Sequence, residues 1–159
     1  MKIVIVSDTH GSRKNIENVC ECNPDADILI HLGDVEDDED YIEAIFGCPT
    51  HIVGGNNDFF SRLPREEEFD LEGHHIFITH GHAYYVSMGE AHLQEEARRR
   101  GADIVMYGHT HVPALTIDAD LVTLNPGSLT YPRQQGRQAT YMVMKLEKGK
   151  QPEVELKTV

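Results

Sequence analysis

Short runs of apolar residues alternate with amphipathic segments over the first third of the chain. Residues 2–7 (KIVIVS) and 27–32 (DILIHL) are almost continuously apolar and predict short strands that are buried on both faces. The segment 12–22 between them has the pattern of a helix. A second helix is expected at 38–46 and a third strand at 50–53. This alternation predicts βαβ units with parallel strands.

The rest of the chain is dominated by strands, the first two of which predict a β-hairpin around a turn at 72–74. A loop rich in proline, glycine and glutamine lies at 125–137, between two of the later strands. The strands are expected at 67–71, 75–79, 103–107, 114–117, 121–124, 140–146 and 153–159.

One further helix is expected between the hairpin and the strand at 103–107. Ser87, followed three residues later by Glu90, has the form of a capping box that opens a helix. The helix then runs to Arg100 and stops at Gly101, because glycine is the usual residue just past a helix end.

These elements predict a fold of the α/β class, a sandwich of two facing β-sheets flanked by helices. A length of 159 residues suits one domain and is too short for two ordinary ones, so residues 1–159 are expected to form a single domain. The net charge of −13 disfavours stable binding to nucleic acid or to an anionic membrane.

The sequence also indicates the cellular compartment of the protein. No stretch approaches the ~20 apolar residues of a spanning helix, and the apolar run at the start is too short for a signal peptide. The three cysteines form no CxxC pair, which fits a reducing compartment. We therefore expect a cytoplasmic protein.

Potential metal ligands follow five of the predicted strands. In α/β sheets the loops at the carboxyl ends of the strands share one edge, so these side chains are expected to converge there. Oxygen and imidazole donors without a thiolate favour manganese first, with nickel, zinc, iron or cobalt as alternatives, and so many donors suit two ions better than one. The candidate ligands are Asp8, His10, Asp34, Asn56, His80, His109 and His111.

In these same positions the sequence resembles the calcineurin-like metallophosphoesterases. The short length is similar to that of the small archaeal and bacterial phosphodiesterase branch of that superfamily, and the Asn125 to Ser128 segment resembles a loop found there. The motifs that match, in order, are Asp8-x-His10, Gly33-Asp34, Gly55-Asn56, His80 and Gly108-His109-x-His111. The resemblance spans residues 1 to about 133 and implies a metallophosphoesterase sandwich with its metal site at the strand ends.

The resemblance also implies a role for each ligand and a reaction. Asp34 would bridge two divalent ions and so take part in catalysis. The first ion would be held by Asp8, His10 and His111, and the second by Asn56, His80 and His109. The implied reaction is hydrolysis of a small phosphate ester, a diester more readily than a monoester, by in-line attack of a metal-bridging hydroxide.

One position departs from the family pattern. Many members have a histidine directly after the motif asparagine, proposed to protonate the leaving group or to hold the phosphate, whereas this chain has Asn57. An amide can donate a hydrogen bond but not a proton, so the acid would be His82 or water. Asp58 is either an orienting carboxylate for the site or a plain turn residue.

Three further expectations concern partners and loops. The alternative function is a non-catalytic metal-binding scaffold that binds a protein partner, as the resembling retromer subunit does. That relative lacks the histidine that corresponds to His10, which is present here. A homodimer is possible because dimers are common in the resembling branch. Arg133 could neutralise a phosphate oxygen, or it could face solvent or a second subunit. The acidic run 36–40 is interpreted as a solvated loop before a helix.

Overall fold

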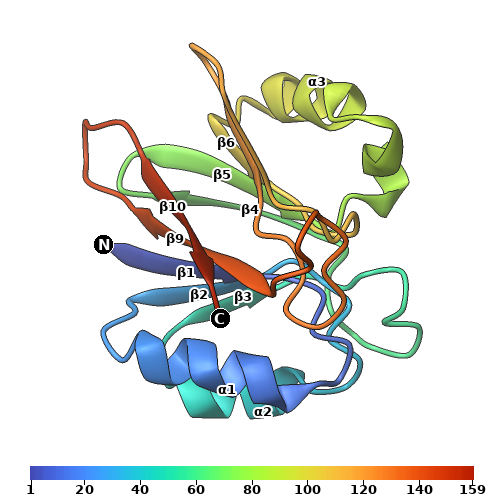
Figure 1. Ribbon diagram of the computed structural model, residues 1–159. Helices are drawn as coiled ribbons and strands as arrows, with labels where there is room; N and C mark the ends of the chain where they lie inside the picture. Colours follow the sequence, from blue (N-terminus) through green and yellow to red (C-terminus); the bar gives the residue numbers. More distant parts are fainter.

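The computed structural model describes residues 1–159 as two five-stranded sheets packed face to face, with helices on the outer side of each (Figure 1). The first sheet has three parallel strands on one side and two antiparallel strands on the other. Its strands are β1 (Lys2–Val6), β2 (Ile28–His31), β3 (Thr50–Ile52), β9 (Thr140–Lys145) and β10 (Glu153–Thr158), in the order β10-β9-β1-β2-β3.

The second sheet has three parallel strands between two antiparallel edge strands. Its strands are β4 (Glu66–Leu71), β5 (His74–Thr79), β6 (Ile104–Met106), β7 (Ala114–Ile117) and β8 (Val122–Asn125), in the order β4-β5-β6-β8-β7. The two sheets flanked by helices confirm the predicted α/β class and the sandwich architecture.

The helices cover the outer faces of the two sheets. Helices α1 (Arg13–Cys22) and α2 (Glu39–Phe46) lie side by side under the first sheet, and α3 (Ala91–Arg100) covers the second sheet (Figure 1). Two short 3₁₀ helices, η1 (His82–Tyr84) and η2 (Val86–Met88), precede α3. None of these helices combines the length and the hydropathy needed to cross a membrane.

Strand β1 shows why its sequence is apolar at successive positions. Successive side chains of a strand point to opposite faces of a sheet. Ile3 and Ile5 pack in the core between the two sheets. Val4 and Val6 pack in the layer between the first sheet and the helices α1 and α2. All four side chains are fully buried, so both faces of the strand need apolar residues.

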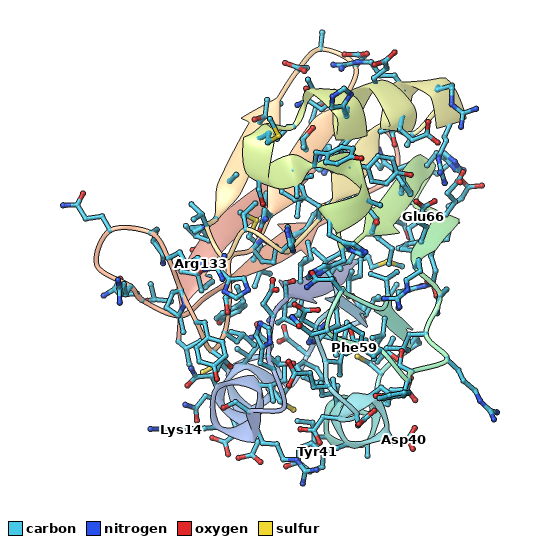
Figure 2. All side chains as sticks on the ribbon, turned by 90° about the vertical axis from the view of Figure 1, so that its right-hand side faces the viewer. Lys14, Asp40, Tyr41, Phe59, Glu66 and Arg133 are labelled. Carbon is cyan, nitrogen blue, oxygen red and sulfur yellow. The ribbon has the colours of Figure 1, made fainter.

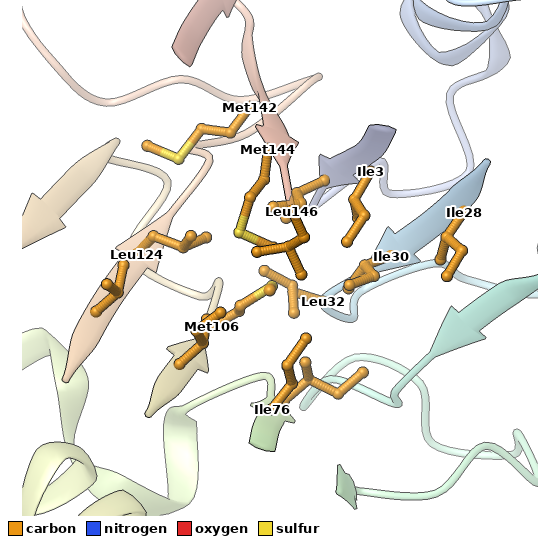
Figure 3. Packing of buried hydrophobic residues seen from close by; sticks show 14 of the residues in the cluster. Ile3, Ile28, Ile30, Leu32, Ile76, Met106, Leu124, Met142, Met144 and Leu146 are labelled. Carbon is orange, nitrogen blue, oxygen red and sulfur yellow. The ribbon is translucent and has the colours of Figure 1, made fainter. Parts of the chain in front are cut away.

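The main core lies between the two sheets and is built from isoleucine, leucine, methionine and valine side chains of both (Figure 3). Met142 and Met144 of β9 lie opposite Leu124 and Met106 of the second sheet in this layer. Full burial of one such side chain stabilises the fold by about 1.5–3 kcal/mol. This packing fixes the two sheets relative to each other, and with them the loops at the strand ends.

The predicted elements agree with the structure to within one or two residues, except at the start of α3. The helix begins at Ala91 rather than near Ser87, and Ser87 makes no capping hydrogen bond. Gly89, with φ 136°, lies between Ser87 and Ala91 and breaks the helical conformation there. The Glu90 carboxylate instead accepts hydrogen bonds from the Tyr107 hydroxyl and other side chains. The capping-box prediction was therefore wrong, because these tertiary contacts use the glutamate.

Candidate metal centre

The seven predicted ligands meet at one edge of the sandwich, where the parallel strands of both sheets end. Figure 2 looks onto this face, which is the right-hand side of Figure 1. Asp8 and His10 follow β1, Asp34 follows β2, and Asn56 follows β3. The three remaining residues come from the second sheet, after β5 and β6, and they are His80, His109 and His111.

One group of donors surrounds Asp8. The ligand atoms of this group all lie within 4.8 Å of one another, a spacing that can hold a metal ion, and its members are Asp8, His10, Asp34 and His111. His111 Nε2 lies 3.1 Å from Asp8 Oδ1 and 3.3 Å from His10 Nε2. These donors have converged from the first sheet and the second sheet together.

A second group of donors surrounds Asn56. The Asn56 Oδ1 atom lies 3.1 Å from His80 Nε2 and 2.9 Å from His109 Nδ1. The His80 and His109 rings meet nearly edge to face, with centroids 5.2 Å apart. Three donors from three different loops are therefore gathered beside the first group.

Asp34 stands between the two groups. Its Oδ2 atom lies 3.8 Å from His10 Nε2 on one side and 3.4 Å from His80 Nε2 on the other. Asn57 holds this carboxylate in place, through its backbone N–H to Oδ1 and its side-chain amide to Oδ2. A carboxylate at this position could be shared by two adjacent cations.

The outer nitrogens of three of the four histidines face acceptors. When one ring nitrogen donates to an acceptor, the other keeps its lone pair for a metal, and this arrangement is usual behind metal-binding histidines. The acceptors are Glu36 Oε1 for His10 (2.7 Å), the Leu32 carbonyl for His80 (2.7 Å) and the Tyr131 carbonyl for His111 (2.8 Å). In each case Nε2 points into the donor groups.

The charges in the site also fit a cation. Asp8 Oδ1 is a buried carboxylate oxygen with no hydrogen-bond partner in the chain, and such an atom needs a compensating cation or water. Burial alone would raise the pKa of Asp34 and Asp8. The nearby His80 ring and the Asn57 amide nevertheless hold the pKa of Asp34 below its usual range, and the nearby His111 ring does the same for Asp8. Both carboxylates are therefore ready to bind a metal.

The surroundings of the site shift the pKa values of its histidines in opposite directions. Burial acts to lower the pKa of His80, but its contacts with Asp34 and Asp8 outweigh burial and raise it. Burial, together with the charge of His80, lowers the pKa of His109 and of His82. A neutral His109 is the form that can bind a metal through Nδ1.

Several predicted ligands have a backbone in the left-handed conformation, with positive φ. Such φ values are unusual for residues other than glycine and gather at functional sites. The neighbouring glycines leave room for the ligands: a Cβ on Gly33 would approach His80 Nδ1 to 2.6 Å, and one on Gly108 would overlap Ser7 Oγ. The ligands with positive φ are Asp8 (55°), His10 (47°), Asp34 (56°), His109 (67°) and His111 (59°).

The three other residues predicted to take part in catalysis lie around the donor groups. Asn57 contacts Asp34 through two hydrogen bonds and forms no hydrogen bond with the histidines. Asp58 is buried and accepts hydrogen bonds from the backbone N–H groups of Val35, Glu36 and Gly55, so it joins two ligand loops. His82 lies beside the second group, with its ring centroid 5.5 Å from that of His80 and Nδ1 without a partner.

Sequence reasoning missed two supporting residues. Glu36 was interpreted as part of a solvated acidic loop, but its carboxylate accepts from His10. Its left-handed conformation (φ 57°) cannot be seen in a run of acids. Ser128 donates to the Asp8 carbonyl and accepts from the Tyr131 N–H, so it ties the 125–137 loop to the first ligand loop. Only the resemblance of residues 125–128 to a family loop hinted at such a role.

His31 is a fully buried histidine outside the donor groups. Its Nδ1 accepts from the Gly33 N–H at 3.2 Å, and its Nε2 lies 3.0 Å from Thr9 Oγ1. Burial lowers its pKa to about 4. The neutral ring therefore connects the loop after β1 to the loop after β2.

Two facing sheets with a carboxylate and imidazole cluster at their strand ends define a metallophosphoesterase fold. Residues 1–149 match the model of the calcineurin-like phosphoesterase superfamily domain, and the chain belongs to this family. The resemblance found in the motifs is thereby confirmed.

Named relatives and a solved structure support this assignment. The chain is 28% identical over 150 residues to the probable metallophosphoesterase YsnB of Bacillus subtilis, covering 92% of this chain and 85% of the relative. It is 29% identical over 165 aligned positions to the phosphodiesterase YfcE of Escherichia coli, covering 89% and 85%. A predicted phosphoesterase from Streptococcus pneumoniae superposes with a TM-score of 0.86 at 28% identity, covering 99% and 88%.

The same fold also occurs in Vps29, a vacuolar protein sorting protein. Zinc-bound Vps29 from Entamoeba histolytica superposes with a TM-score of 0.80, covering 99% of both chains. The identity is 17%, so this likeness concerns the fold alone.

Proposed function

We propose that this protein is a dinuclear metal-dependent phosphodiesterase that acts on small phosphate esters. The observation that carries the proposal is the place of Asp34, whose Oδ2 atom lies 3.8 Å from His10 Nε2 and 3.4 Å from His80 Nε2. A single shared carboxylate between two donor groups suits two adjacent cations better than one. The family membership and the relative named phosphodiesterase YfcE support the choice of reaction.

Each donor group would hold one ion, with Asp34 shared between them. The ions, when bound, supply a hydroxide nucleophile near neutral pH and neutralise the charge that develops on the phosphoryl oxygens. The first ion would be held by Asp8, His10 and His111, and the second by Asn56, His80 and His109. Four imidazoles and no thiolate favour manganese, with nickel, zinc, iron or cobalt as alternatives to test.

The chain positions the ligands and offers one free group to the substrate. His10, His80 and His111 are oriented through their outer nitrogens, and Asn57 orients Asp34. His82 is partly exposed beside the second group, with its ring centroid 5.5 Å from that of His80, and it would be the side chain that contacts an ester oxygen. An amide at position 57 cannot protonate the leaving group, so we expect esters with acidic leaving groups to react fastest.

A metal-replacement assay tests this function. The protein is stripped with a chelator, refilled with each divalent ion in turn, and assayed on bis(4-nitrophenyl) phosphate and 4-nitrophenyl phosphate. The expected result is turnover that needs the added ion, is faster on the diester and is absent in Asp34→Asn. Full metal occupancy without turnover of either ester would overturn the proposal.

The alternative is a non-catalytic scaffold of the same fold. Vps29 shows only that the fold is shared, and the observation that favours a scaffold is two exposed aromatic side chains beside the site, Phe59 (73% exposed) and Phe60 (96%). A scaffold does not need the complete set of oriented donors found here, so the enzyme is the better account of the geometry. In the assay above, a scaffold would bind ions and gain stability without hydrolysing either ester.

A further inference from the structure

Two hollows of opposite charge lie beside the donor groups. Figure 2 labels one lining residue of each hollow, Phe59 and Arg133, and these belong to different loops. One hollow, of about 340 Å³, is acidic and is lined by Glu36, Asp37, Asn57, Asp58, Phe59 and Phe60. The other, of about 420 Å³, has no carboxylate and is lined by Thr130, Tyr131, Pro132, Arg133 and Arg137.

The basic hollow is fixed to the first donor group through the backbone. The Arg133 N–H donates to the His111 carbonyl at 3.0 Å, and His111 Nδ1 faces the Tyr131 carbonyl at 2.8 Å. The Tyr131 ring lies against His10, with centroids 5.1 Å apart. A group bound in this hollow would therefore lie next to the site at which the ester is cleaved.

Arg133 and Arg137 are free to bind an anion. Neither side chain forms an ion pair or a hydrogen bond within the chain, and both are exposed. Arg98 and Arg100, by contrast, are each held by two or more carboxylates. In a chain with a net charge of −13, two unpaired guanidinium groups in a hollow without acids form a local site for negative charge.

We propose that Arg133 and Arg137 bind a second phosphate group of the substrate. The preferred substrates are then diesters that carry an additional phosphate monoester close to the scissile phosphate. Guanidinium groups suit this task because they form paired, charge-assisted hydrogen bonds to phosphate oxygens. The carboxylates of the opposite hollow repel a second phosphate, so they direct it to the arginines. This inference rests on the proposed phosphodiesterase function.

A pair of chromogenic esters tests the inference. Thymidine 5′-(4-nitrophenyl phosphate) and its 3′-phosphorylated form share the scissile bond and the leaving group and differ by one phosphate. We expect wild-type protein to show a kcat/KM about tenfold higher for the phosphorylated ester, the gain typical of one charge-assisted contact. Arg133→Gln combined with Arg137→Gln should bring this ratio close to one.

A matched control removes two positive charges elsewhere. Lys148 lies in the turn between β9 and β10, and the antiparallel pairing of Lys145 with Lys2 places that turn at the edge opposite to the site. Lys145→Gln combined with Lys148→Gln removes two exposed charges at that edge and should keep the wild-type ratio. Circular dichroism of the double variant checks that it is folded. An unchanged ratio in the double variant, or an equal loss on both esters, overturns the inference while leaving the proposed function in place.

Binding gives a second readout that needs no turnover. Calorimetric titration with thymidine 3′,5′-bisphosphate and thymidine 5′-phosphate should show about tenfold tighter binding of the bisphosphate to wild-type protein. The double arginine variant should bind the two alike. If the metal-loaded protein hydrolyses neither ester, the proposed function fails, and the titration alone decides whether the hollow binds phosphate. Equal affinities in wild-type protein would overturn the inference.

Discussion

Asn57 contacts both carboxylate oxygens of Asp34, with its backbone N–H 2.9 Å from Oδ1 and its side-chain nitrogen 2.7 Å from Oδ2. Asp34 is the carboxylate that lies between the two donor groups. In many members of the resembling family this position is a histidine. The Asn57 amide that stands here orients Asp34, which an imidazole could also do, but unlike a protonated imidazole it cannot transfer a proton.

Removing this amide should weaken metal binding. Asn57→Ala leaves Asp34 with the backbone hydrogen bond only, so its carboxylate is free to rotate away from one donor group. Loss of a hydrogen bond to a metal ligand typically costs 10–100-fold in metal affinity or activity, and we expect a loss of about that size. Competition with a chelator measures the affinity. Asn18→Ala on the exposed side of α1 is the control, and equal affinities in both variants would contradict the role of Asn57.

Replacing the shared carboxylate should have a larger effect. Asp34→Asn removes the charge between the two donor groups, so both ions lose a ligand. We expect fewer than two ions per chain by elemental analysis and no measurable hydrolysis. Asp40→Asn, on the exposed surface of α2, makes the same chemical change away from the site and should behave as wild type. Two tightly bound ions in Asp34→Asn would argue against a bridging carboxylate.

Stability should depend on the metal. A ligand that binds only the folded state stabilises it by about 2.7 kcal/mol at a hundredfold excess over Kd. For a chain of this size that corresponds to a rise in Tm of about 5–10 °C. Differential scanning calorimetry with manganese, compared with a chelated sample, measures the rise. The same Tm in both samples would mean that the donor groups do not bind the ion.

His31 should make the metal-free protein less stable at acidic pH. Its pKa is lowered to about 4 by burial, whereas an unfolded histidine takes up its proton near pH 6.5. As the pH falls from 7 to 5, the unfolded state gains a proton that the folded state does not, so the free energy of unfolding decreases, by about 2 kcal/mol for this group.

The variant His31→Asn separates this contribution from that of other groups. Its amide oxygen can accept from the Gly33 N–H but does not titrate, so its stability should fall less between pH 7 and pH 5. Urea unfolding of chelated samples at both pH values gives the difference. The same loss in wild type and variant would show that the His31 ring is not the group that titrates.

The close approach of Gly108 to the first ligand loop predicts a steric effect. A methyl group at this position would overlap Ser7 Oγ and lie 2.9 Å from Asp8 Oδ2, so Gly108→Ala should cost about 1–3 kcal/mol of stability. At Gly54 the nearest atom to an added methyl group lies 3.4 Å away on the flexible Arg65 side chain. Gly54→Ala should therefore change the midpoint of urea unfolding far less than Gly108→Ala does.

The positions of the candidate ligands could be predicted because each one follows a strand, and strand ends of one α/β sheet share an edge. The orientation of the ligands could not be predicted in this way. Glu36 and Asn57 act through contacts with residues far along the chain, His10 and Asp34, which a local pattern does not contain. The wrong capping-box prediction at Ser87 has the same cause, because the Glu90 carboxylate that a capping box needs accepts a hydrogen bond from the distant Tyr107 hydroxyl.

The donors come from both sheets, with Asp8, His10, Asp34 and Asn56 after strands of the first sheet and the three other histidines after strands of the second. A cation held by both sets is a cross-link between the two layers, comparable to a disulfide in a chain whose three cysteines are all free. Withdrawing it would loosen the sandwich at the strand ends while the opposite edge stays closed by the apolar core. Backbone amides on both sides of the site would then lose hydrogen-exchange protection together, as one unit.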